Sequence, residues 1–381
     1  MLSKNIQFKN FNFKFNNKLI KRDLKKLLSE DNETIKSLKP TYKYQYDKKL
    51  IKKKKNNNLT IIGMGGSILG TQAIHDFLKY KIKKKVFFYD NLESNLKINP
   101  KSINIIISKS GNTLETIANT NILINKNQTN IFVTELRNSY LRSLALKIKA
   151  EIINHNNFIG GRYSVLSEVG MLPAELMGLN ENKFKQLNNL IKNKQFVNSL
   201  VSNVCNTLFF IKKKKFNSII LNYDSSSNNL FKWYQQLIAE SLGKKGKGIL
   251  PIISSMPKDN HSLMQYYLDG PKNNFFTFFY VKEKKTLKLN NNEIIQSHNY
   301  LKNKTLEKIR FSQKISTENV FSRKKIPFRS FEILNKSEKS LGELFCFFIL
   351  ETILLGRALK VNPYDQPSVE LIKKETKKIL I

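Results

Sequence analysis

The residue best suited to proton transfer in this 381-residue chain is Glu240, near the end of residues 233–243. If that segment is a helix, Gln236 and Glu240 lie four residues apart on one face, and Gly243 is typical of a residue that ends a helix. The negative end of the helix dipole disfavours a carboxylate and so favours proton uptake by Glu240, as a general base requires. A solvated carboxylate on a surface helix is the alternative.

Arg162 directly follows Gly160 and Gly161 and would supply a permanent positive charge beside a site of proton transfer. Arginine is rare in this chain, with 8 residues against 58 lysines, so its use here points to a need for a planar set of donors. Such a group stabilises an oxyanion that develops during a reaction. A structural arginine that caps a helix or a sheet edge is the alternative.

Residues 60–70 (TIIGMGGSILG) have the pattern of a buried strand that runs through glycines into a helical segment, residues 71–80. Free backbone N–H groups and the helix dipole at such a turn attract an anion, so we expect a phosphate as the ligand of this turn. The dinucleotide-binding fingerprint is incomplete, because Ile68 stands where its third glycine would be. A tight turn that only packs the helix on the sheet is the alternative.

A second turn of this kind follows the predicted strand at residues 103–108 and is rich in hydroxyl groups. Its candidate phosphate ligands are Ser108, Lys109, Ser110 and Thr113. The lysine provides a point charge, and Asn112 with Glu115 predicts a capping box that begins a helix. We therefore expect this turn to hold an oxyanion, with an ordinary capped turn as the alternative.

Two further segments carry groups that a binding cleft would use. His261 lies in a turn within residues 259–265, and residues 362–374 form a proline-rich loop followed by a helix start, with Ser368 or Asp365 as its cap. This arrangement predicts that Gln366 and Lys373 reach the cleft. The alternatives are a histidine in a surface turn and a lysine in water on a C-terminal helix.

The elements that must position these residues have the pattern of an α/β protein. Short β-branched runs lead into turns and helical stretches at residues 59–63, 86–89, 103–108 and 130–134. This alternation predicts βαβ units and a parallel sheet. A helix at 196–213 and a strand at 218–223 begin a second cycle of the same kind.

We therefore predict two domains behind a basic leader. The predicted parts are a leader at residues 1–55, a first α/β domain at 56–185, a low-complexity connector around 179–195, and a second α/β domain at 195–381 that ends in a helix. In the leader, Phe8, Phe11, Phe13 and Phe15 are typical of a short amphipathic strand or a packing arm.

The net charge of +37 comes mostly from lysine, in runs such as residues 51–58, 83–85 and 212–215. These runs lack the arginines and interleaved aromatic residues of specific nucleic-acid readout, so we expect no specific nucleic-acid partner. We interpret the lysines as solvated surface, with salt-sensitive adsorption of a polyanion as the alternative.

Cysteine and histidine usage argues against a disulfide framework and against a metal site. Cys205 and Cys346 form no CxxC pair, and the four histidines lack paired helical spacing. The apolar stretch at residues 344–350 is too short to span a membrane, and the first twenty residues lack the apolar core of a signal peptide. We expect a cytoplasmic protein with no metal and no membrane partner.

Taken in order, six of these segments resemble the phosphoglucose isomerase (glucose-6-phosphate isomerase) family. They are GMGGSILG, SKSGNTLET, GGRYSVLSEVGMLPAE, QQLIAESLGKKGKG, DNHSLMQYYLDGP and NPYDQPSVELIKK, within residues 60–375. The resemblance implies two sugar-isomerase-type α/β/α sandwich domains with parallel-rich sheets. It also implies a homodimer to which His261 contributes across the interface, and no cofactor.

The same resemblance implies reversible conversion of glucose 6-phosphate to fructose 6-phosphate. Glu240 would move a proton between carbons 2 and 1 through a cis-enediol, and Arg162 would stabilise the enediolate. His261 and Lys373 would assist opening of the sugar ring. The implied substrate-binding residues are Gly66, Ser67, Ser108, Lys109, Ser110, Thr113, Gly161, Gln236 and Gln366.

Two other functions stay open at this stage. One is a related sugar-phosphate isomerase that also accepts mannose 6-phosphate. The other is a noncatalytic sugar-phosphate sensor whose basic surface contacts nucleic acid, and it predicts that Glu240, His261 and Lys373 do not share one site.

Overall fold

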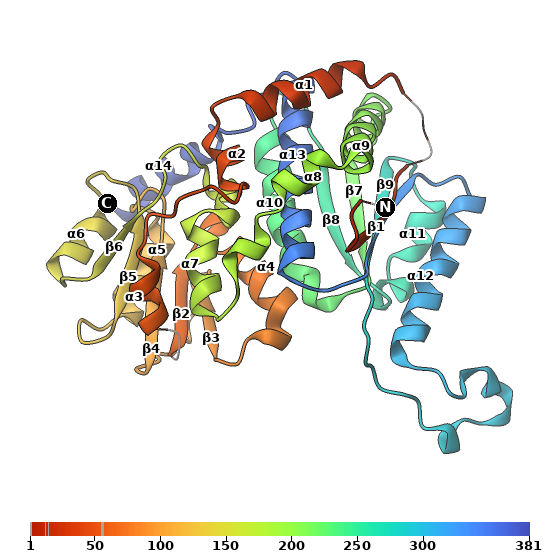
Figure 1. Ribbon diagram of the computed structural model, residues 1–381, viewed down its shortest axis with the longest axis horizontal. Helices are drawn as coiled ribbons and strands as arrows, with labels where there is room; N and C mark the ends of the chain where they lie inside the picture. The colour runs from red at the N-terminus through yellow and green to blue at the C-terminus, as the bar shows by residue number, and fades with distance from the viewer. Residues whose placement is uncertain (1, 12, 14, 55–56) are drawn as a thin grey trace.

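The computed structural model of the protein describes residues 2–11, 13, 15–54 and 57–381, without the side chains of residues 50, 52 and 53. Part of the lysine run at residues 51–58 therefore lies outside the described residues. The chain forms two five-stranded sheets with a layer of helices between them (Figure 1). Seven of the eight strand pairings among the described residues are parallel, which confirms the predicted α/β class with parallel-rich sheets.

The first sheet is parallel throughout. Its spatial order is β3 (Val86–Tyr89), β2 (Asn58–Gly63), β4 (Ser102–Ile107), β5 (Asn130–Thr134) and β6 (Glu151–Asn154). The inner strands bury nearly every residue because helices cover both faces of the sheet. Ile105 faces the centre of the molecule, whereas Ile106 packs under α5 (Leu114–Leu123) and α6 (Tyr140–Lys147) on the outer face.

The second sheet gains an edge strand from the N-terminal segment. Its order is β1 (Ile6–Lys9), β10 (Phe328–Ile333), β9 (Asn274–Val281), β7 (Asn217–Asn222) and β8 (Leu250–Ser255). β1 runs antiparallel to β10 with Ile6 opposite Ile333, and the ring of Phe8 lies 4.5 Å from that of Phe331. A segment more than 300 residues away in sequence therefore completes this sheet.

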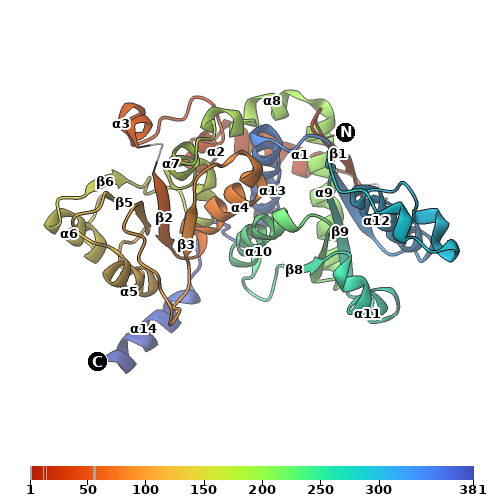
Figure 2. The same ribbon diagram turned by 90° about the horizontal axis from the view of Figure 1, so that it is seen from below.

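Helices α4 (Leu69–Leu78), α10 (Asn228–Leu242) and α13 (Glu338–Ala358) pack on one another between the two sheets (Figure 2). α13 contains the apolar stretch 344–350, and that stretch is buried throughout. The central core is therefore helical.

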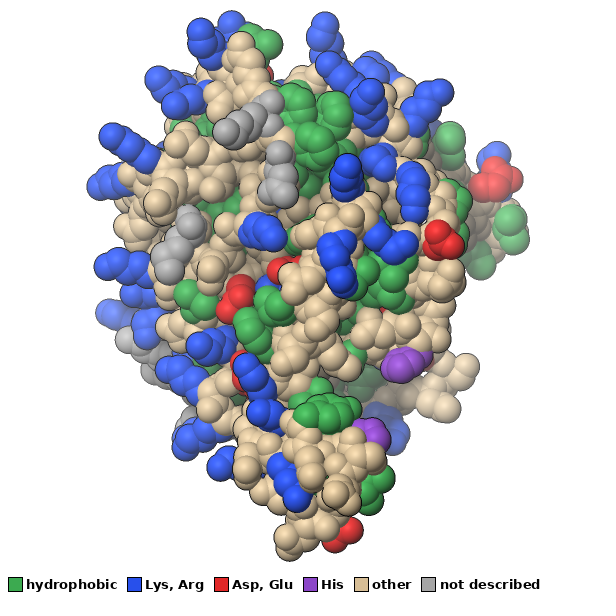
Figure 3. Space-filling model, turned by 90° about the vertical axis from the view of Figure 1, so that its right-hand side faces the viewer, with side chains coloured by type: hydrophobic (Ala, Val, Ile, Leu, Met, Phe, Trp, Pro, Cys, Tyr) green, Lys and Arg blue, Asp and Glu red, His purple; other side chains and the backbone are tan. Residues whose placement is uncertain are grey.

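The remaining helices surround this core. They are α1 (Lys18–Ser29), α2 (Glu33–Ser37), α3 (Lys48–Lys53), α7 (Glu168–Leu176), α8 (Leu187–Lys192), α9 (Lys194–Lys212), α11 (Met264–Asp269), α12 (Leu306–Arg323) and α14 (Val369–Leu380). No helix among the described residues is long and apolar enough to cross a membrane. On the face drawn in Figure 3, Lys and Arg side chains are scattered over much of the surface, with few acidic side chains among them.

The predicted connector at residues 179–195 is folded and partly buried. It contains the short 3₁₀ helix η4 (Glu181–Phe184) and α8, and the side chains of Phe184 and Leu187 are fully buried. A Cβ added at Gly342 would lie 2.1 Å from the Phe184 carbonyl oxygen, so α13 and η4 touch through their backbones. This segment is thus part of the central core.

Candidate functional site

The two predicted phosphate-binding turns lie side by side because their strands are neighbours. β2 and β4 pair in parallel with Gly63 opposite Ile107, so both strands end at the same edge of the sheet. The 3₁₀ helix η1 (Gly65–Ser67) and α4 follow β2, and the turn at Ser108 follows β4. Both turns therefore lie at the carboxyl ends of the strands, where ligands bind in open α/β sheets.

Glycine is required in the first turn because other elements approach it closely. Gly65 has a φ of +53°, and a Cβ there would lie 2.8 Å from Gln236 Nε2. A Cβ on Gly66 would lie 2.3 Å from the carbonyl carbon of Gly161 and 2.4 Å from the backbone nitrogen of Arg162. The glycines thus bring this turn against both α10 and η3 (Gly161–Leu166).

In the second turn the hydroxyls bond to one another and to the backbone. The oxygens of Ser108 and Thr113 lie 3.0 Å apart, and Gly111 N donates to Ser108 Oγ at 3.2 Å. Lys109 Nζ donates to the Asn157 carbonyl at 2.8 Å and lies 3.3 Å from a Glu135 carboxylate oxygen. This lysine is therefore held at the edge of the turn by two acceptors.

The capping box predicted from Asn112 and Glu115 is wrong. Helix α5 begins after Thr113, which makes no side-chain capping bond. Asn112 Oδ1 instead accepts from the backbone N–H of Tyr140 at 2.9 Å, so this side chain ties the turn to the start of α6.

Arg162 is buried, and all five of its N–H groups have acceptors. Nε donates to Ser241 Oγ at 2.8 Å, and Nη2 donates to the carbonyls of Pro363 at 2.7 Å and Asp365 at 3.0 Å. Nη1 donates to Glu240 Oε2 at 3.1 Å and to Gln366 Oε1 at 2.8 Å. Three bonds thus anchor the guanidinium, while Nη1 points toward two predicted site residues.

Glu240 lies in the last turn of α10, as predicted, and its side chain is 31% exposed. Its two carboxylate oxygens have different donors: Arg162 Nη1 binds Oε2, and Gln236 Nε2 binds Oε1 at 2.9 Å. The buried Gln236 Oε1 has no partner among the described residues. The site therefore combines an oriented, accessible carboxylate with a fixed cation and a neighbouring amide oxygen that has no hydrogen-bond donor among the described residues.

Comparison with known proteins identifies the family to which this chain belongs. The family model described as phosphoglucose isomerase matches residues 16–250. The chain is 34% identical over 352 residues to a glucose-6-phosphate isomerase of Mycoplasmopsis pulmonis, covering 84% of this chain and 82% of the relative. The chain belongs to the phosphoglucose isomerase family.

Other comparisons agree with this family membership. A glucose-6-phosphate isomerase of Methanocaldococcus jannaschii is 34% identical over 357 residues, covering 86% of each chain. The crystal structure of a hypothetical protein from Thermus thermophilus has the same fold, with a TM-score of 0.83 over 96% of this chain and 94% of that one at 21% identity. The sequence resemblance is thus confirmed.

Two of the residues carried over from the family resemblance, His261 and Lys373, form no hydrogen bond with Arg162 or Glu240 among the described residues. His261 ends the short 3₁₀ helix η6 (Lys258–His261) after β8 and is exposed. Lys373 Nζ bonds to Glu370 at 2.7 Å on α14, a helix with no buried residue that projects from the body of the molecule (Figure 2). Neither Ser368 nor Asp365 provides the predicted cap: Ser368 precedes α14 without a capping bond, and Asp365 bonds elsewhere.

Sequence reasoning missed residues that position the predicted ones. Ser241 accepts from Arg162 and lies 2.9 Å from the Tyr163 hydroxyl, which also donates to the Pro363 carbonyl at 3.0 Å. Lys244 donates to the turn that carries Gln366. Adjacency to Glu240 could have drawn attention to Ser241, but Lys244 lies in a lysine-rich stretch and has no distinguishing signal.

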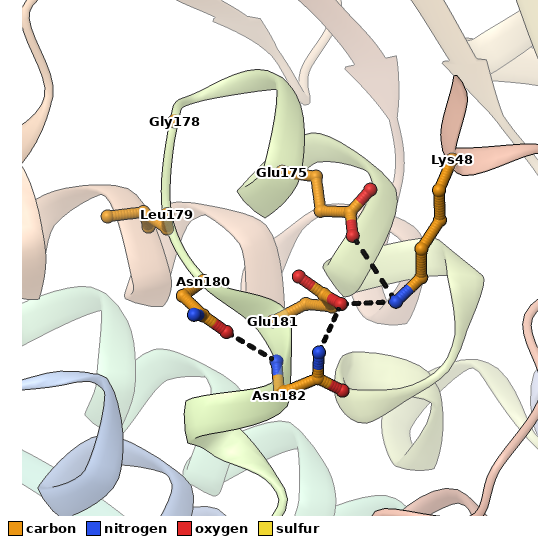
Figure 4. A pocket seen from close by; sticks show the side chains of 7 residues that line it. All are labelled: Lys48, Glu175, Gly178, Leu179, Asn180, Glu181 and Asn182. Carbon is orange, nitrogen blue, oxygen red and sulfur yellow. Dashed lines mark hydrogen bonds and ion pairs between the residues drawn. The ribbon is translucent and has the colours of Figure 1, made fainter. Parts of the chain in front are cut away.

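A pocket of about 400 Å³ lies elsewhere, between the start of α3 and the end of α7 (Figure 4). Lys48 pairs there with Glu175 at 3.7 Å and with Glu181. None of the predicted site residues lines it. Among the described residues, no group of three or more His, Cys, Asp or Glu side chains is placed to hold a metal ion.

Proposed function

We propose that this protein interconverts glucose 6-phosphate and fructose 6-phosphate, with Glu240 as the base. The observation that carries the proposal is the cluster in which Arg162 Nη1 and Gln236 Nε2 each bind one oxygen of the Glu240 carboxylate. Membership of the phosphoglucose isomerase family and the names of the relatives support the same reaction. The proposed path is ring opening followed by proton transfer through a cis-enediol.

The phosphate is assigned to the two strand-end turns. Ser67, Ser108, Ser110 and Thr113 supply hydroxyls there, Lys109 supplies a positive charge, and the backbone of Gly66 supplies close approach. Because η1 also touches η3 and Gln236, a sugar held by its phosphate at these turns extends toward the Glu240 carboxylate. The backbone at Gly161 lines the path between the phosphate at the two turns and the end of the sugar near Glu240.

In the reaction, Glu240 takes the proton from carbon 2 of the open-chain aldose and returns it to carbon 1. The electrons of the broken C–H bond form the C1=C2 double bond while those of the carbonyl π bond move to oxygen 1, and the charge of Arg162 stabilises the resulting enediolate. Oxygen 1 gains the proton that the carbon-2 hydroxyl loses, so that return of the first proton to carbon 1 leaves a ketone at carbon 2. Nη1 can serve the substrate because its present acceptors, Glu240 and Gln366, are side chains that can exchange for sugar oxygens. Gln236 and Gln366 orient the sugar hydroxyls.

Ring opening is assigned to His261 and Lys373, with His261 acting from the partner subunit of a homodimer. Support comes from the exposure of His261, which takes no part in the hydrogen bonds that Arg162 makes with the described residues. A mixing experiment tests this. Inactive Glu240→Gln and His261→Ala subunits, combined at equal amounts, should recover about a quarter of wild-type activity, because mixed dimers hold one intact site each. Mixtures as inactive as the parents would contradict a contribution across the interface.

The reaction itself is tested by a coupled assay with fructose 6-phosphate, run beside mannose 6-phosphate. We expect glucose 6-phosphate to form from fructose 6-phosphate. Equal turnover of mannose 6-phosphate would indicate the broader isomerase, and binding of sugar phosphates without turnover would indicate the sensor.

We infer a cytoplasmic location from the chemistry of the cysteines. Cys205 and Cys346 are both free thiols, as is typical of a reducing compartment. Fractionation of cells with a tagged chain tests this inference.

A further inference from the structure

The turn at residues 362–366, which presents Gln366 to the site, is held by two cations from different parts of the fold. Arg162 Nη2 binds the carbonyls of Pro363 and Asp365. Lys244, two residues after the end of α10, donates from Nζ to the Asp365 carbonyl at 2.6 Å, to Asp365 Oδ1 at 2.6 Å and to the Asn362 carbonyl.

We propose that Lys244 is a positioning residue for the isomerisation, acting by fixing this turn so that Gln366 and Arg162 keep their places. The proposal rests on the function proposed above and assigns Lys244 no contact with the substrate.

The contacts of Lys244 are those of a fixed cation rather than a solvated one. Its side chain is 13% exposed, and its three N–H groups have three acceptors, all of them in the turn. The second oxygen of Asp365 accepts from Asn362 Nδ2 at 3.0 Å, so the carboxylate is held on both sides. Lys247 adds a bond to the Leu359 carbonyl at 2.9 Å, just before the turn.

The turn affects Arg162 as well as Gln366, because the same guanidinium binds both the turn and the proposed base. Among the described residues, Nη2 donates to two carbonyls of the turn, and Nη1 divides its bonds between Gln366 and Glu240. If the turn moves, Nη2 loses its anchors and Nη1 shifts relative to Glu240. Loss of Lys244 is therefore expected to affect both binding of the sugar and the chemical step.

The test compares Lys244→Met with Lys245→Met, a matched loss of one positive charge at the adjacent exposed residue. We expect Lys244→Met to lower kcat/KM for fructose 6-phosphate by about tenfold or more, through both a higher KM and a lower kcat, because small misplacements of this kind reduce rates steeply. Lys244→Arg should recover most of the loss. Amide hydrogen exchange at residues 362–366 should be faster in Lys244→Met and unchanged in Lys245→Met.

Wild-type kinetics in Lys244→Met, or an equal loss in Lys245→Met, would overturn the proposal. A fall in thermal stability without faster exchange in the turn would also overturn it, since that pattern indicates a general structural role. Failure of the wild-type chain to isomerise fructose 6-phosphate would instead refute the proposed function, and the exchange measurement would then decide separately whether Lys244 holds the turn.

Discussion

Adding one methyl group at Gly66 should separate the proposed phosphate-binding turn η1 from the segment that carries Arg162. The new Cβ would lie 2.3 Å from the carbonyl carbon of Gly161 and 2.4 Å from the backbone nitrogen of Arg162. Both contacts are with backbone, so no side-chain rotation relieves them, and η1 and η3 must move apart by about 1 Å to reach ordinary contact. A displacement of that size at a catalytic site can lower the rate about 100-fold.

The assay is the kinetics of Gly66→Ala with fructose 6-phosphate, together with its thermal unfolding. We expect kcat/KM to fall by about 100-fold while the variant remains folded at the assay temperature. Gly160→Ala is the matched control, because a Cβ there meets nothing closer than Tyr163 Cδ2 at 3.6 Å and should be tolerated. Near-normal kinetics in Gly66→Ala, or an equal loss in Gly160→Ala, would refute the claim that glycine is required at position 66 because η1 and η3 approach each other closely there.

Three further predictions concern charge. Arg329 and Glu351 form an ion pair in which each side chain is 1% exposed, so Arg329→Met should lower the free energy of unfolding by about 3–5 kcal/mol, measured by urea denaturation. Burial lowers the pKa of His155 to about 4 from 6.5, so the folded state binds fewer protons than the unfolded state between these values. Stability should therefore fall by up to about 3 kcal/mol as pH drops from 6.5 toward 4, and His155→Leu should lose that pH dependence. Replacing Lys109 and Ser110 together by Ala should raise KM about 10- to 100-fold with little change in the thermal midpoint, whereas parallel losses of stability and activity would indicate a structural role.

The parallel sheets could be predicted from the sequence because buried strands have a strong local pattern. β3 and β5 have the predicted bounds, residues 86–89 and 130–134, and the strands predicted at 59–63, 103–108 and 218–223 agree with β2, β4 and β7 to within one residue at each end. A continuous apolar run that ends in a polar turn is sufficient to predict the bounds of a strand when helices cover both faces of the sheet.

Pairings and side-chain contacts over long sequence distances could not be predicted in the same way. No local pattern indicates that β1 joins β10, since register with a distant strand depends on the tertiary fold. The hydrogen-bond partner of Asn112 could not be predicted either, because its side chain binds the backbone at the start of α6 and does not cap α5.

In the candidate site, too, local contacts could be predicted from the sequence and long-range contacts could not. The sequence indicated that Gln236 and Glu240 share a helix face, and the structure adds the bond between them. It did not indicate that Arg162 has Ser241 and two carbonyls of the 362–366 turn as acceptors. Those bonds join segments some 80 and 200 residues from Arg162, and only the packing of α10 and α13 between the sheets brings them together.

Solvent deuterium incorporation by Glu240→Gln tests the role of Glu240 most directly. With fructose 6-phosphate in D₂O, the wild-type chain should exchange hydrogen at the reacting carbons during turnover, and the variant should lose both exchange and isomerisation by about 100- to 10,000-fold. The variant should still bind the phosphorylated sugar, since the turns at Ser67 and Ser108 are unchanged. Near-normal deuterium incorporation by Glu240→Gln would contradict the assignment of Glu240 as the base.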